Sequence, residues 1–133
     1  MRIYVDTAPV IYVVERREPW AHAVDAWLAA PECTILSSAL TRMECLVLPL
    51  REGNSALEAE YRRFFTDAVA EVSLSDVVLD LAAEIRATHG FRTPDAIHLA
   101  AAQTGGCDIF LTNDRRLAHY PGLAVEALGA APS

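Results

Sequence analysis

Residues 2–6 read Arg-Ile-Tyr-Val-Asp, a short apolar run that ends in a carboxylate. The run has the length and composition of a buried strand, and Asp6 stands at its carboxyl end. Short apolar strands that alternate with helices indicate a parallel sheet covered on both faces. The sequence therefore predicts an α/β chain with a central, mostly parallel sheet of four to five strands. Further strand-like runs occur at 34–36, 71–74, 108–112 and, more weakly, 123–125.

Helices are predicted between these strands, and capping residues, prolines and glycines mark their ends. Ser37 or Ser38 can cap the helix that carries residue 44, and Pro49 and the turn at 53–55 mark a break after it. Thr93-Pro94 is a helix start, with a capping hydroxyl followed by proline at the first helical position. The other predicted helices cover about 8–16, 20–30, 56–70, the segment between Ser75 and Gly90, and the run from Pro94 to about Thr104.

The length of 133 residues fits one domain, predicted over 1–128, with a loose tail over 129–133. Hydrophobic residues make up 53% of the chain, which is typical of a globular protein and not of a disordered one. Three cysteines without a CxxC spacing favour reduced thiols in a cytosolic protein. With no leader-like start and no long apolar span, we expect a soluble, cytoplasmic protein without membrane contact.

The charge of the chain limits the classes of function. A net charge of −7 argues against a broad basic face that grips nucleic acid, but it permits an acidic metal site that acts on phosphate. All eleven basic residues are arginine. The lack of lysine excludes P-loop NTPases, Schiff-base enzymes and response-regulator receivers, whereas arginine suits forked contacts to phosphate.

Four carboxylates stand where a parallel sheet would bring them to one edge. Asp6 and Asp114 follow predicted strands, Asp95 opens a helix, and Glu44 lies one helical turn after Thr41. Taken singly, the three aspartates could be helix or turn caps, whereas Glu44 lies within an apolar run where an unpaired acid is costly. Ligands bind outside the carboxyl ends of parallel strands, and clustered carboxylates suit hard cations. The joint pattern predicts metal-dependent phosphodiester chemistry.

Polar residues beside these acids are candidates for orienting the carboxylates or contacting substrate. Five side chains near the acids could be caps and turn residues, or they could hold the carboxylates in place as metal sites require: Thr7, Ser38, Thr41, Thr112 and Asn113. For Ser38 we favour the capping role. Arg92 and Arg115 could be solvated surface residues, or they could contact phosphate at the rim. We favour the functional interpretation for Thr7, Thr112, Asn113, Arg92 and Arg115.

His98 follows Asp95 by three residues, so both project from one helix face. A metal-binding Asp-x-x-His pair is one interpretation. A histidine under the sheet that is held by a hydrogen bond is the favoured one. Arg42 and Arg116 also flank the acids, but we rank them behind Arg92 and Arg115 as phosphate contacts.

Four motifs in this order resemble the PIN domain, specifically the VapC-type toxin ribonucleases of prokaryotic toxin–antitoxin pairs. Each motif is weakly specific alone, but the set is strongly specific and spans nearly the whole chain. The motifs are Tyr-Val-Asp-Thr at 4–7, Ser-x-x-Thr-x-x-Glu at 38–44, Thr-Pro-Asp-Ala-Ile-His-Leu-Ala at 93–100 and Phe-Leu-Thr-Asn-Asp at 110–114.

The resemblance implies a three-layer α/β/α sandwich and a Mg²⁺ or Mn²⁺ site. By position, Asp6, Glu44, Asp95 and Asp114 match the acidic quartet of the family, and Thr112 matches its frequent hydroxyl neighbour. We expect the first three acids to be the core ligands. Asp114 is expected to act through water or at a second metal position. Ala8 departs from the family, where a small polar residue often follows Asp-Thr.

The resemblance also implies an activity and partners. It predicts an endoribonuclease toxin whose site is covered by a VapB-like antitoxin, in a homodimer that meets DNA only through the antitoxin. Ile11, Val14 and residues 46–48 are candidate apolar contacts for that antitoxin, with core packing as the alternative.

Other functions stay open at this point. A PIN-like module that binds RNA or protein without cutting is the main alternative, and the intact quartet argues against it. A nuclease acting on DNA or flap structures would usually carry insertions that 133 residues leave little room for. A haloacid-dehalogenase-type phosphatase is disfavoured because residues 6–8 lack a second aspartate and the chain has no lysine.

Overall fold

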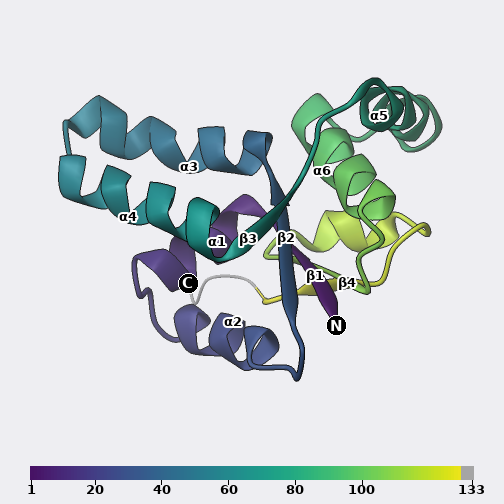
Figure 1. Cartoon of the computed structure of the whole chain (residues 1–133). Helices are drawn as coiled ribbons and strands as arrows, with labels where there is room; N and C mark the ends of the chain where they lie inside the picture. The colour runs from purple at the N-terminus through teal and green to yellow at the C-terminus, as the bar shows by residue number, and fades with distance from the viewer. Residues whose placement is uncertain (130–133) are drawn as a thin grey trace.

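A computed structural model describes residues 1–129 of the chain and contains a five-stranded sheet (Figure 1). The strand order is β3-β2-β1-β4-β5, and every neighbouring pair runs parallel. The predicted parallel sheet of four to five strands is therefore confirmed, with five strands. Of the predicted loose tail, residues 130–133 lie outside the described residues. The strands are β1 (Arg2–Val5), β2 (Thr34–Ser38), β3 (Val69–Val72), β4 (Ile109–Thr112) and β5 (Val125–Ala127).

Helices cover both faces of the sheet, which confirms the α/β/α sandwich (Figure 1). One face packs against α5, α6 and the 3₁₀ helix η1, and the other packs against α1 to α4. No helix within residues 1–129 is long and apolar enough to cross a membrane. The helices are α1 (Thr7–Val14), α2 (Trp20–Leu28), α3 (Ala39–Glu52), α4 (Ser55–Asp67), α5 (Asp76–His89), α6 (Thr93–Thr104) and η1 (Arg115–His119).

Strand β1 lies at the centre of the sheet and contributes to both cores. Tyr4 faces the α5–α6 side and stacks on Phe110 with ring centroids 5.3 Å apart, while Ile3 and Val5 belong to the opposite core. This alternation fixes the register, because a shift by one residue would turn Tyr4 to the other face. In the observed register Val5 pairs with Leu111, so β1 and β4 end side by side.

The predicted break is confirmed at the 53–55 turn but is wrong at Pro49, because α3 continues through this proline to Glu52. A proline removes one backbone hydrogen bond of a helix, but Pro49 lies with Cys45 and Leu46 on the buried face of α3, and the chain stays helical there. The helix ends instead at Gly53, whose left-handed conformation (φ 64°) closes the last turn. Two strands also differ in position. β3 begins two residues before the predicted run, and β5 begins two residues after it, because pairing with neighbouring strands sets these ends.

Of two predicted caps, Ser38 is confirmed in position but not as a side-chain cap, and Thr93 is wrong. Ser38 stands at the cap position of α3, but its hydroxyl accepts a hydrogen bond from Tyr4 instead of capping. Thr93 is already helical, so Arg92 is the cap residue of α6, and the Thr93 hydroxyl accepts from Arg86. The predicted ends of α5 are confirmed, since Ser75 accepts from the third backbone N–H and Gly90 follows in the left-handed conformation.

Candidate active site

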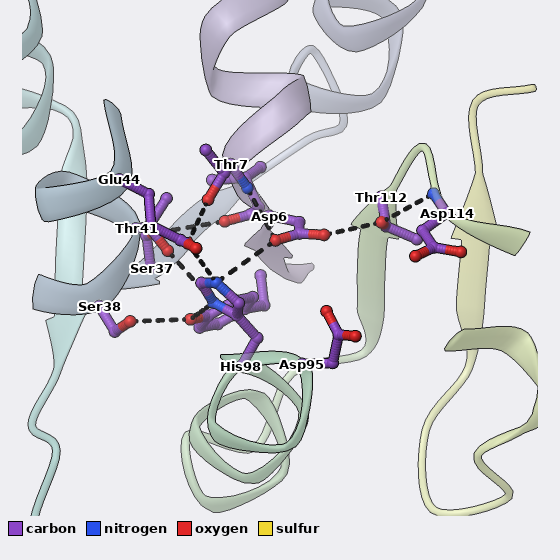
Figure 2. Close-up of polar contacts among 12 residues, drawn as sticks. Asp6, Thr7, Ser37, Ser38, Thr41, Glu44, Asp95, His98, Thr112 and Asp114 are labelled. Carbon is purple, nitrogen blue, oxygen red and sulfur yellow. Dashed lines mark hydrogen bonds and ion pairs between the residues drawn. The ribbon is translucent and has the colours of Figure 1, made fainter. Parts of the chain in front are cut away.

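Asp6 lies at the carboxyl edge of the sheet, between β1 and α1, and both its carboxylate oxygens accept hydrogen bonds (Figure 2). The Thr7 backbone N–H donates to Oδ1 at 2.8 Å, which caps α1. The Thr112 hydroxyl, at the end of β4, donates to Oδ2 at 2.8 Å. Two strands and a helix start therefore fix the orientation of this carboxylate.

Glu44 comes from the second turn of α3 and meets Asp6 through shared donors (Figure 2). Its Oε1 accepts from the Thr7 hydroxyl at 2.7 Å and from His98 Nε2 at 2.7 Å. His98 Nε2 also lies 3.6 Å from Asp6 Oδ1. Burial opposes ionisation of Glu44, but the hydrogen bonds from His98 and Thr7 outweigh it and lower the pKa of the carboxyl. Asp6 and Glu44 are called the inner pair below.

His98 supports the inner pair from below and is almost fully buried, with 2% of its surface exposed. Its Nδ1 lies 3.0 Å from the Tyr4 hydroxyl and 3.4 Å from Thr41 Oγ1. The Tyr4 hydroxyl in turn donates to Ser38 Oγ at 2.9 Å. Burial lowers the pKa of His98, but the bond to Glu44 and the charges of both inner carboxylates raise it above the ordinary value. The favoured interpretation of His98 as a hydrogen-bonded histidine is confirmed.

Asp95 and Asp114, called the outer pair below, lie on the other side of the site. Asp95 comes from the first turn of α6 and points toward the side where Asp6 and Asp114 lie (Figure 2). Asp114 caps η1 by accepting from the Arg116 backbone N–H at 3.0 Å. The Arg116 guanidinium joins the two acids, with Nη2 2.5 Å from Asp114 Oδ2 and 3.8 Å from Asp95 Oδ2. Arg92 Nε also lies 3.8 Å from Asp95 Oδ2.

The pKa values of the two outer carboxyls are shifted in opposite directions. Burial is the main cause of a raised pKa for Asp95, and the charges of Asp114 and Asp6 add to it, although Arg92 and Arg116 oppose it. The Arg116 guanidinium, which is hydrogen-bonded to Asp114, lowers the pKa of that carboxyl. The arginine therefore stabilises negative charge mainly on Asp114.

The structure separates the predicted supporting residues. Thr7 and Thr112 contact the inner pair, whereas Asn113 donates instead to the Tyr12 hydroxyl at 3.0 Å. Arg92 lies beside Asp95, but for Arg115 no side-chain hydrogen bond or ion pair occurs within residues 1–129. Arg42 pairs with Glu71 and not with any of the four acids.

Sequence reasoning missed that Arg116 joins the outer pair and that Tyr4 and Thr41 contact His98. The signal for Arg116 was local, because a turn capped by Asp114 brings the residue two positions later back to the cap. Tyr4 and Thr41 carried no such signal. Their contacts with His98 join β1, α3 and α6 and depend on the packing of the three elements.

The donor set suits a hard divalent cation, since all four acids offer oxygen ligands. As the side chains stand, however, no three His, Cys, Asp or Glu residues in the described part of the chain are arranged to hold a metal ion. In this arrangement Thr7 and His98 donate to Glu44 Oε1, and Arg116 pairs with the outer carboxylates. The four carboxylates fit Mg²⁺ or Mn²⁺ by chemistry.

Comparison with known proteins agrees with this fold. The family model of the PIN domain matches residues 3–123, and the chain belongs to the PIN domain family. It is 37% identical over 133 residues to Ribonuclease VapC46 of Mycobacterium tuberculosis (strain ATCC 25618 / H37Rv), covering 94% of this chain and 96% of that one. The expected VapC-type resemblance is thereby confirmed.

Two known structures share the fold at low sequence identity. VapBC2 from Rickettsia felis, bound to a DNA fragment from their promoter, matches with a TM-score of 0.78 and 13% identity, over 96% of this chain and 98% of that one. A toxin–antitoxin complex from Klebsiella pneumoniae matches with a TM-score of 0.71 and 24% identity, over 92% and 95% of the two chains.

Proposed function

We propose that this chain is a Mg²⁺- or Mn²⁺-dependent endoribonuclease, the toxin component of a type II toxin–antitoxin system. The observation that carries the proposal is the gathering of Asp6, Glu44, Asp95 and Asp114 along one edge of the sheet. The identity to Ribonuclease VapC46 over most of both chains supports RNA as the substrate.

The inner pair supplies the fixed part of the proposed site. Thr7 and Thr112 hold Asp6 in one orientation, and Glu44 Oε1 is occupied by two donors. Glu44 Oε2 accepts no hydrogen bond within residues 1–129, so this oxygen is left for a ligand. A divalent ion bound here would polarise the phosphate and provide a water activated for attack on phosphorus.

The outer pair supplies the adjustable part. Asp95 and Asp114 can contribute further oxygen ligands once Arg116 turns away from them. Arg116 and Arg92 are more than half exposed, so both can then contact an RNA phosphate at the rim. In this scheme the same arginine would pair with the outer carboxylates before metal binds and then contact the substrate.

The proposal includes the partners that the resemblance implied. A VapB-like antitoxin would cover the site, the toxin would form a homodimer in the cytoplasm, and DNA would be met only through the antitoxin. The similarity to the Klebsiella pneumoniae complex supports an antitoxin partner. Among the candidate contacts, Val47 and Leu48 are 42% and 46% exposed, whereas Leu46 is buried and Ile11 and Val14 pack against the core.

The decisive experiment incubates purified, antitoxin-free protein with total RNA and Mg²⁺ or Mn²⁺. An EDTA control and the variants Asp6→Asn and Glu44→Gln accompany it. We expect discrete fragments that require metal and disappear in both variants. Cleavage that survives in both variants would show that the four-carboxylate site is misplaced. If the protein binds RNA but neither cleaves it nor binds metal, the alternative of a non-cutting RNA-binding module would be favoured.

A further inference from the structure

A cavity of about 360 Å³ opens beside Asp95, between the α5–α6 loop and η1. It is lined by His89 at the end of α5, by residues 90–92 of that loop, by Asp95, and by Arg116 and His119 of η1. This volume lies at the small end of the roughly 300–1,000 Å³ of ligand sites, so it suits a small group such as one nucleotide. Its contact with Asp95 makes it continuous with the proposed active site.

Phe91 gives the cavity an aromatic wall. Its ring centroid lies 6.1 Å from that of His89 and 6.5 Å from that of Tyr120, which is buried. The Arg86 side chain holds this loop in place, since it donates to the Phe91 carbonyl at 2.8 Å and to the Thr93 hydroxyl at 3.0 Å. The wall is therefore preorganised and does not have to form around a ligand.

Two guanidinium groups give the same cavity a cationic lining. Arg92 and Arg116 keep 75% and 61% of their side chains exposed, and each lies 3.8 Å from Asp95 Oδ2. This pairing stands out in a chain of net charge −7. Phe91 is half-buried, since it lines the cavity and also packs against the core on the α5–α6 side. An aromatic side chain near guanidinium groups suits a ligand that is both flat and anionic.

We infer that this cavity binds the nucleotide next to the scissile phosphate, with its base against Phe91 and its phosphate at Arg92. The inference rests on the proposed function and adds a nucleotide subsite to it. A base can enter such a cavity only when it is unstacked and unpaired, so the subsite would hold an unpaired nucleotide. Any base can stack on an aromatic ring, so the cavity is expected to select unpaired nucleotides with little preference for base sequence.

The test measures RNA binding, so it does not depend on cleavage. The Asp6→Asn protein in Mg²⁺ is titrated into a fluorescently labelled single-stranded RNA of ten nucleotides, and anisotropy gives Kd. Added to this background, Phe91→Leu and Arg92→Gln are each expected to weaken binding about tenfold. The matched controls Phe64→Leu and Arg63→Gln lie on α4, which packs against the opposite face of the sheet, and should change Kd less than about twofold.

A second titration uses the same strand annealed to its complement, which should bind about tenfold more weakly to the Asp6→Asn parent. Thermal unfolding of each variant checks the fold, and Arg92→Gln, at an exposed side chain, keeps the test valid even if Phe91→Leu is destabilised. Equal binding of duplex and single strand would overturn the inference, as would unchanged Kd values in both cavity variants or no RNA binding by the parent. If the cavity variants bind RNA more weakly but the wild-type protein does not cut RNA, the subsite would be supported and the proposed nuclease activity contradicted.

Discussion

The inner pair, Asp6 and Glu44, and the outer pair, Asp95 and Asp114, contain the same chemical groups but are held differently. The inner carboxylates are fixed by threonine and histidine donors that belong to β4, α1 and the buried side of α6. The outer carboxylates are joined by Arg116, whose side chain is 61% exposed. The comparison suggests that half of the site is built with the core, while the other half can rearrange when a cation or RNA arrives.

The largest expected difference comes from removing one carboxylate from each pair. Asp6→Asn should weaken Mn²⁺ binding at least about a hundredfold, since even residues behind a metal ligand cost 10–100-fold. Asp114→Asn should weaken it only about tenfold, because this acid is expected to act through water. Isothermal titration with Mn²⁺ measures both. Asparagine also caps helices, so unfolding curves should stay close to wild type. Equal losses in the two variants would remove the distinction between the pairs.

The next effect concerns the histidine beneath the inner pair. His98→Gln should weaken Mn²⁺ binding about 10–100-fold, since Glu44 loses the donor that orients it. It should also lower the free energy of unfolding by about 1–3 kcal/mol, because the Tyr4 hydroxyl and Glu44 lose a buried partner. His22→Gln, at an exposed histidine of α2, is the control and should change neither quantity. A variant that loses stability but keeps its Mn²⁺ affinity would limit His98 to a structural role.

A smaller and more local effect separates Thr112, the last residue of β4, from Asn113, which follows it. Thr112→Val removes the hydroxyl that donates to Asp6 and should weaken Mn²⁺ binding about tenfold. Asn113→Ala should change it less than about twofold, because Asn113 contacts Tyr12 and not a carboxylate. The same titration measures both variants. A loss in Asn113→Ala as large as in Thr112→Val would restore the orienting role that the sequence predicted for Asn113.

The smallest expected effect tests the outer pair, and it has the opposite sign. Arg116→Gln removes the cation that competes with metal for Asp95 and Asp114, so Mn²⁺ binding should strengthen about two- to fivefold at low salt. The gain should shrink as salt screens the exposed ion pair. Arg115→Gln, one residue earlier and without such contacts within residues 1–129, should show no gain. Weaker Mn²⁺ binding in Arg116→Gln would mean that the arginine orients the outer pair for metal.

The strands and the positions of the four acids could be predicted because the signals are local. Apolar runs, capping residues and glycines gave the elements to within a few residues, since each signal acts on its own segment. The errors arose where packing competes with local preference. Pro49 stays helical on a buried face, and the Ser38 and Thr93 hydroxyls take side-chain partners instead of capping.

The sequence by itself determined that Asp6, Glu44, Asp95 and Asp114 would meet at one edge, because parallel strands end together and each acid stands at an element end or in an early helical turn. Only the tertiary structure decided how they are held. Whether His98 reaches Glu44, and whether Arg116 joins the outer pair, depends on side-chain directions across elements distant in sequence. Local sequence patterns determine the backbone position of each acid, and the packing of distant elements determines which groups its side chain contacts.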